Sequence, residues 1–154
     1  MRLLLILAAL ALAPVPAAAQ SLLLKGPDGR TATLNAADLK AMPRVTLVLT
    51  VGASRYEYQG VLLKDLAVRV GAPDQPHGPD FAQTVLVKAG DGYRVAFGLG
   101  ELDKTLRTNR VILADTVDGG PLEANDGPFK VFAEGDMRPA RGVRQVTEIE
   151  LVRH

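Results

Sequence analysis

Apolar residues after residue 20 occur in short runs, and each run ends near Gly, Pro, Asp or Asn. Val, Leu, Thr and Ile dominate these runs, a composition typical of β-strands. Helical spacing is confined to 36–42 and 61–70, with one more helical turn expected within 99–106. Because strands and helices do not alternate regularly, we predict an α+β fold of mixed β-sheets with two or three short helices. The predicted strands are 21–25, 31–34, 45–51, 54–59, 84–88, 93–97, 110–116, 129–132 and 147–151.

Turn and cap residues define several of these boundaries. Asp91-Gly92 lies between two apolar runs and predicts a tight hairpin, because this dipeptide tolerates positive φ. Asn35 is placed to cap the helix that follows it, and Gly71 to end the second helix in a left-handed conformation. Gly52-Ala53 is expected to interrupt a strand that resumes at Ser54.

The first 19 residues have the order of a secretory signal peptide. Arg2 precedes an unbroken apolar run over 3–12, and three alanines at 17–19 offer the small residues of a cleavage site. The run is too short to span a bilayer, which needs about 20 apolar residues. We therefore expect a signal peptide over 1–19, one domain over 20–154, a periplasmic or secreted location, and no stable membrane insertion after cleavage.

Charge in the expected mature chain is balanced. Lys and Arg number 18, Asp and Glu number 17, and one of the basic residues, Arg2, falls in the leader. A net charge near zero argues against a nucleic-acid partner or an anionic membrane bound through bulk charge. The expected partner is instead a small anionic ligand or a periplasmic protein.

The chain contains no cysteine. This absence excludes disulfides, thiol catalysis, iron–sulfur ligation and thiolate-held metals. The two histidines, His77 and His154, are too few for a histidine-rich zinc or copper site, so no metal ligands are expected.

Acid–base or nucleophilic catalysis has only weak candidates. Ser54 lacks the second glycine of a nucleophile elbow, and His77 lies in a proline-rich loop. Three acidic pairs could form a carboxylate dyad, but all flank predicted turns, where such residues commonly cap the backbone. No residue is therefore assigned a catalytic role. The three pairs are Glu101/Asp103, Asp115/Asp118 and Glu134/Asp136.

The strongest candidate binding cluster is basic. Arg138, Arg141 and Arg144 recur every three residues and can share one face of a turn-like segment, where planar guanidinium groups suit phosphate or carboxylate oxygens. Arg94, at the start of a predicted strand, is a fourth candidate for anion binding or a plain surface residue. Structural ion pairing is the alternative for the cluster. The carboxylates available for it are Glu134, Asp136 and Glu148.

Several stretches, taken in order, resemble the oxidoreductase molybdopterin-binding domain, the pterin-holding fold of the sulfite oxidase family. The resemblance runs from about residue 47 to residue 151 and implies the α+β fold of that family. The stretches are GVLLKDL at 60–66, DGY at 91–93, ILA at 112–114, DGGPL at 118–122, DGPFKV at 126–131 and RGVRQVTEI at 141–149.

The resemblance also marks departures. In catalytic members of that family a cysteine thiolate binds molybdenum, and the corresponding stretch here, 50–54, has no thiol. The family's closing lysine, which contacts the pterin cofactor, corresponds to Arg141, and its neighbouring tryptophan to Gly142. The family's histidine before the late glycine corresponds to Asp126.

We therefore expect an exported, non-catalytic or accessory module. It would bind a small anionic or pterin-like ligand, or a protein partner, through Arg94, Arg138, Arg141 and Arg144. No cofactor is expected from the residues alone, and molybdopterin is implied by the resemblance only. The alternatives are a molybdenum-cofactor-dependent oxidoreductase with a non-cysteine ligand set, and a structural protein whose ancestral pocket is filled.

Overall fold

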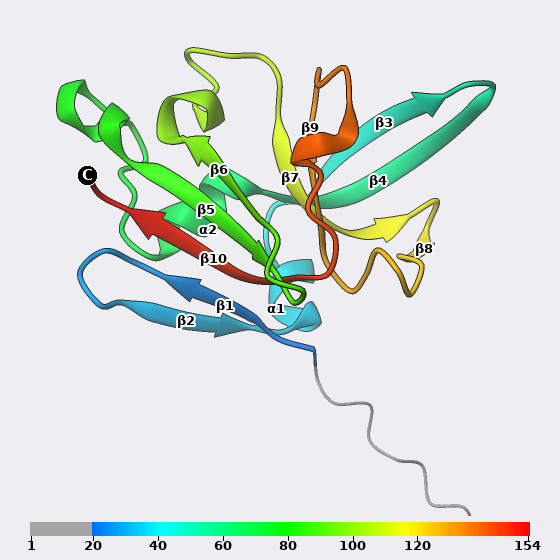
Figure 1. The fold of residues 1–154 in the computed structure, drawn as a ribbon, viewed down its shortest axis with the longest axis horizontal. Coiled ribbons are helices and arrows are strands. Elements are labelled where there is room, and N and C mark those ends of the chain that lie inside the picture. Colours follow the sequence, from blue (N-terminus) through cyan, green and yellow to red (C-terminus); the bar gives the residue numbers. More distant parts are fainter. Residues whose placement is uncertain (1–19) are drawn as a thin grey trace, which may run out of the picture.

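The computed structural model describes residues 20–154. The expected signal peptide at 1–19 lies outside the described residues. The fold is α+β, with two five-stranded sheets and a few short helices, as the sequence predicts (Figure 1).

The first sheet joins the two ends of the described chain. Its order is β2-β1-β10-β5-β6, and only β1 and β10 run parallel to each other. The C-terminal strand β10 therefore lies at the centre, between the N-terminal hairpin and the hairpin around Asp91-Gly92. Its strands are β1 (Leu22–Lys25), β2 (Thr31–Leu34), β5 (Thr84–Ala89), β6 (Arg94–Gly98) and β10 (Val146–Val152).

The second sheet is antiparallel throughout. Its order is β3-β4-β7-β8, and β9 pairs with another part of β7. The β3–β4 hairpin projects away from the rest of the molecule (Figure 1). The strands of this sheet are β3 (Val45–Val51), β4 (Ser54–Leu62), β7 (Val111–Val117), β8 (Gly120–Pro121) and β9 (Lys130–Ala133).

The helices are short, and the predicted caps of two of them are confirmed. The Asn35 side chain accepts hydrogen bonds from the amides of Ala37 and Asp38 at 2.8 and 3.0 Å, and Gly71 follows the second helix with φ +111°. No helix among residues 20–154 is long and apolar enough to cross a membrane. The α-helices are α1 (Ala36–Lys40) and α2 (Leu63–Arg69), and the 3₁₀-helices are η1 (Gly78–Ala82), η2 (Leu99–Leu102) and η3 (Pro139–Arg141).

One hydrophobic cluster connects the two sheets. Helix α2 contributes Leu63 and Leu66, both fully buried, to a cluster that also contains Ile149 of the first sheet and Leu113 of the second. The alternating burial of β5 and β10 places their apolar side chains on this core. The core therefore holds the two sheets together and fixes the space between their ends.

The segment Gly52-Ala53 reverses the chain, so the prediction of one interrupted strand is wrong. Val51 pairs with Ser54, and β3 and β4 form an antiparallel hairpin along their whole length. Gly52 has φ +60°, a conformation that glycine adopts without the steric cost of a side chain. The residues on either side of Gly52 have the same pattern whether they form one interrupted strand or two paired strands. The backbone conformation at Gly52 decides between these two arrangements.

The second helix starts later than its hydrophobic spacing predicts. Strand β4 continues to Leu62, and helix α2 begins at Leu63. Gly60 lies inside the strand, where a Cβ atom would be 2.0 Å from the carbonyl oxygen of Leu113. Pairing with β7 keeps this segment extended, and that long-range contact overrides the helical pattern of its residues.

We expect Gly60→Ala to destabilise the fold by about 2–3 kcal/mol, because the added methyl group meets backbone rather than a movable side chain. Urea denaturation measures the loss. Gly90→Ala is the matched control, since its new Cβ would lie 3.5 Å from Thr147 Cγ2, an ordinary contact. Equal stability of the two variants would contradict the close packing of β4 on β7.

Candidate functional site

A groove of about 930 Å³ opens between the ends of the two sheets. The hairpin β3–β4 and strand β9 of the second sheet form one side, and the β5–β6 turn of the first sheet contributes to the other. The segment 136–144, between β9 and β10, lies along the groove. The residues that line the groove include Thr50, Tyr56, Tyr58, Tyr93, Asp126, Lys130, Phe132, Arg138, Gly142 and Arg144.

Three aromatic rings form a continuous wall of the groove. Tyr58 and Phe132 have ring centroids 4.0 Å apart, and Tyr56 lies 6.4 Å from Tyr58. Tyr56 and Tyr58 are two residues apart on β4, so both side chains leave the same face of the strand. Neighbouring rings are tilted by 39° and 40° to each other, so each ring by itself, rather than the wall as a plane, offers a face on which a planar ligand could stack.

A charged pair lies beside this wall. Lys130 Nζ is 2.6 Å from a carboxylate oxygen of Asp126 and 4.7 Å from the centre of the Phe132 ring. Burial, and next the negative charge of Asp126, raise the pKa of Tyr58, which stays a neutral phenol at physiological pH. Asp126 lines the groove as well, and Lys130 already pairs with its carboxylate.

Two of the four predicted arginines lie on the groove. Arg138 and Arg144 line it, and both are exposed. Within residues 20–154 neither guanidinium makes a salt bridge or a side-chain hydrogen bond. Their donors are therefore free to bind an anion that enters the groove.

Arg141 points elsewhere and is fully engaged. Its guanidinium bonds both oxygens of Asp136 at 2.9 and 2.5 Å and one oxygen of Glu101 at 2.8 Å. The same group lies 5.1 Å from the centre of the Phe97 ring. The hydrogen bonds that Arg141 donates to Asp136 and then to Glu101 raise its pKa above its usual range. This arginine holds the segment 136–144 against the first sheet rather than facing the groove.

Arg94 lies outside the groove lining. It begins β6, is exposed, and stands opposite Lys88 on β5. The adjacent Tyr93 does line the groove, and its hydroxyl donates to the Ala140 carbonyl at 2.7 Å. Tyr93 therefore ties the β5–β6 turn to the arginine-bearing segment.

The acidic pairs do not form a catalytic dyad, because the carboxylates have separate partners. Asp115 accepts two bonds from Arg44, Asp103 pairs with Lys64, and Asp118 accepts from the Glu57 amide at 2.8 Å. Hydrogen bonds from Arg110 hold the pKa of Glu134 below its usual value. These groups are ion-paired or capping residues, which is the alternative that their turn positions favour.

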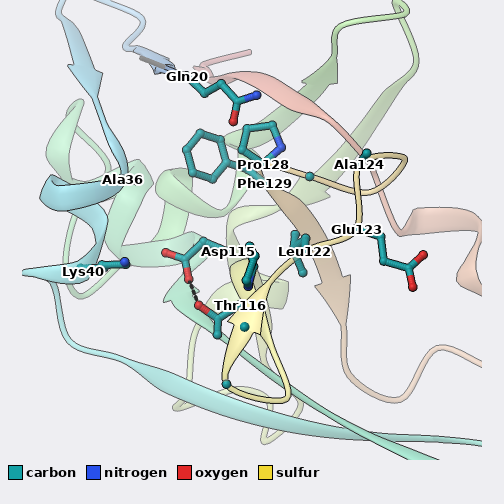
Figure 2. Close-up of a pocket in the computed structure, with 14 residues that line it drawn as sticks. Gln20, Ala36, Lys40, Asp115, Thr116, Leu122, Glu123, Ala124, Pro128 and Phe129 are labelled. Carbon is teal, nitrogen blue, oxygen red and sulfur yellow. Dashed lines mark hydrogen bonds between the residues drawn. The ribbon is translucent and has the colours of Figure 1, made fainter. Parts of the chain in front are cut away.

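A second cavity of about 550 Å³ lies beside the β7–β8 turn (Figure 2). Asp115 and Thr116 stand next to each other in its wall and are hydrogen-bonded at 2.8 Å. Arg44 already pairs with the Asp115 carboxylate, and the two other charged residues of the lining, Lys40 and Glu123, have opposite signs. This cavity also lacks the three-ring wall of the groove. We regard the groove as the better candidate site.

A thiolate-held molybdenum centre does not fit these residues. The chain has no cysteine, and no cluster of three or more His, Cys, Asp or Glu side chains occurs in the described part of the chain. In the stretch corresponding to the family's ligand, Thr50 lines the groove beside the hairpin turn. Soft sulfur donors are therefore missing where the resemblance would need them.

Sequence reasoning missed the aromatic wall. Tyr56 and Tyr58 alternate on a strand with few other large apolar residues, and that pattern is a usable signal for an exposed aromatic surface. Phe132 and Lys130 come from a strand far along the chain, and only the pairing of β7 with both β4 and β9 brings them to the tyrosines.

The α+β fold with mixed sheets has a counterpart among solved structures. Among solved structures it is similar to a crystal structure of the sulfane dehydrogenase SoxCD from Paracoccus pantotrophus, with a TM-score of 0.64 and 16% sequence identity. The similarity covers 91% of this chain and 40% of that chain, so this chain spans less than half the length of the protein it matches.

At this identity the similarity shows the fold alone. It supports the predicted resemblance to a sulfite-oxidase-type, molybdopterin-domain-like fold at a distance. No family model matches the chain, and no curated protein matches it.

Proposed function

We propose that this protein is an exported, non-catalytic binding module whose groove holds a small anionic ligand with a planar ring, of pterin-like chemistry. The observation that carries the proposal is the groove itself. It has an aromatic wall on β4 and β9, together with the guanidinium groups of Arg138 and Arg144, which pair with no side chain within residues 20–154. The rings would stack on the planar part of the ligand, and the guanidinium groups would bind its phosphate or carboxylate.

The cysteine-free composition favours a binding role over molybdenum chemistry. A molybdopterin ligand could use the aromatic wall and the two arginines, but the chain supplies no thiolate for the metal. Metal analysis of protein produced in a cofactor-competent host separates the two functions. Near-stoichiometric molybdenum in purified protein would overturn the non-catalytic assignment.

Binding of pterin-6-carboxylate, followed by calorimetry, tests the proposal. We expect Arg138→Ala/Arg144→Ala to weaken binding about 10- to 100-fold. Both guanidinium groups are exposed, so each charged hydrogen bond should contribute about 0.7–1.4 kcal/mol, below the usual range for such bonds. Thermal stability should change little, since neither side chain pairs with another described residue.

Arg94→Ala is the matched control, because it removes the same charge from an exposed position outside the groove. Tyr58→Leu tests the stacking surface separately and should weaken binding without changing net charge. Unchanged affinity in the double arginine variant, or equal loss in the Arg94 control, would contradict the assignment of the groove. Absence of binding in the wild-type protein would also contradict it.

A further inference from the structure

Strand β3 has an open edge. It ends the second sheet and pairs only with β4 among the described strands. Its sequence, VTLVLTV, contains no charged residue and no proline, and the side chains of Val48 and Leu49 are 48% and 41% exposed. Edge strands are usually protected from pairing by lysine, proline or a bulge, and β3 has none of these. The backbone N–H and C=O groups on this edge are therefore available to pair with another strand.

The sequence of β3 reads the same in both directions. Val48 is its centre, with Leu47 and Leu49, Thr46 and Thr50, and the two terminal valines placed symmetrically around it. An antiparallel pair of two such strands, related by a two-fold axis at Val48, would place identical residue types opposite each other at every position. A two-fold interface requires a self-complementary surface of this kind.

We propose that a second copy of this chain pairs with β3 edge to edge, and that the two copies form one continuous sheet across a two-fold axis at Val48. No two charged residues of β3 would lie opposite each other, and its Thr–Thr and aliphatic cross-strand pairs are stabilising ones. A partner with an unrelated sequence would not need the symmetry that β3 has, so the symmetry favours a second copy.

The surroundings of β3 are compatible with this arrangement. Thr46, Val48 and Thr50 are exposed, so no described side chain covers this face of the strand. The Thr46 carbonyl accepts one hydrogen bond from Arg110 Nη1 at 3.3 Å, which leaves its second lone pair available. A two-fold axis normal to the sheet keeps the same face of both copies on the same side. Because Leu49 lines the groove, the grooves of both copies would open on one face of the dimer.

Cysteine cross-linking tests the register directly, because the wild-type chain has no thiol. In Val48→Cys the two introduced residues would be directly opposite each other, with Cα atoms about 4.5–5.5 Å apart. This separation is within the Cα range of disulfides, so mild oxidation should form a disulfide-linked dimer. Thr46→Cys is the matched control on the same exposed face. Its two copies would be four residues out of register, about 14 Å apart, and should not cross-link.

Three further measurements complete the test. A mixture of Thr46→Cys and Thr50→Cys should cross-link, because the register places these positions opposite each other. Light scattering should show twice the monomer mass for wild-type protein and the monomer mass for Val48→Lys, where two like charges would meet. Leu106→Lys, an equivalent change at a residue 58% exposed and outside β3, should remain dimeric.

Wild-type protein that stays monomeric at high concentration would overturn the proposal. So would a dimer that persists in Val48→Lys, or cross-linking that is as efficient in the Thr46→Cys control as in Val48→Cys. None of these measurements involves the ligand of the groove, so their result is independent of the proposed function.

Discussion

Replacing Asp103 with alanine is expected to lower the free energy of unfolding by about 3–5 kcal/mol, the largest effect we predict for a single side chain. Asp103 is 5% exposed, and one of its oxygens is 3.3 Å from Lys64 Nζ. Its other oxygen accepts hydrogen bonds from the amide and hydroxyl of Thr105 at 2.8 and 2.5 Å. One carboxylate thus connects helix α2 to the loop that follows η2.

The loss of stability comes from the Lys64 ammonium group, which would remain buried without the Asp103 carboxylate. Lys64 is 8% exposed, and its remaining partner would be the Asp74 carbonyl at 3.0 Å. A buried ammonium group without a counter-charge is strongly unfavourable, whereas removal of both charges is much less so. The double variant Lys64→Met/Asp103→Leu should therefore be more stable than Asp103→Ala alone.

Urea denaturation at neutral pH measures this prediction. Asp28→Ala is a suitable control, because the salt bridge of Asp28 to Arg30 is exposed and should contribute less than about 1 kcal/mol. An Asp103→Ala variant as stable as this control would show that the buried pair does not hold α2 to the loop.

Arg141→Ala is expected to cost about 2–3 kcal/mol at neutral pH, through lost charged hydrogen bonds to Asp136 and Glu101. The effect should be smaller than at Asp103, because the Arg141 side chain is 36% exposed and water screens its charge. Its loss would release the segment 136–144 from η2 and from the Phe97 ring.

The effect of Arg141→Ala should depend on pH in a defined direction. Hydrogen bonds from Arg141 lower the pKa of Asp136, and at Glu101 the bonds from Arg141 and the Gly98 amide outweigh the opposing effect of burial. Carboxyl groups with lowered folded-state pKa stabilise the protein above their unfolded pKa of about 4 and lose that contribution as pH falls through the folded value. The stability difference between wild type and Arg141→Ala should therefore shrink in acid.

Thermal unfolding at pH 7 and near pH 2.5 compares the two conditions. Arg138→Ala is the control from the same segment, since its guanidinium has no ionic partner among the described residues and its removal should leave stability nearly unchanged. A difference between wild type and Arg141→Ala that is the same at both pH values would show that the arginine acts through packing alone.

Local chemistry made much of the fold predictable. The hairpin at Asp91-Gly92, the cap at Asn35 and the left-handed Gly71 depend on residues next to each other in the chain, and all three are confirmed. The failures are at Gly52 and Gly60, where a backbone conformation or a contact with β7 decides between alternatives that the residue pattern leaves equal. Propensity is weak where a distant strand competes for the same backbone.

The absence of a thiol is a property of composition, and no fold can supply the missing ligand. The arginine cluster is likewise visible in the chain, but its division of roles is not. Arg141 turns to Glu101, forty residues away in sequence, while Arg144 faces the groove. Tyr58 and Phe132 come close together because β7 pairs with both of their strands, β4 and β9. Amino-acid types determine which chemistry is available, and long-range packing alone decides which groups remain free to use it.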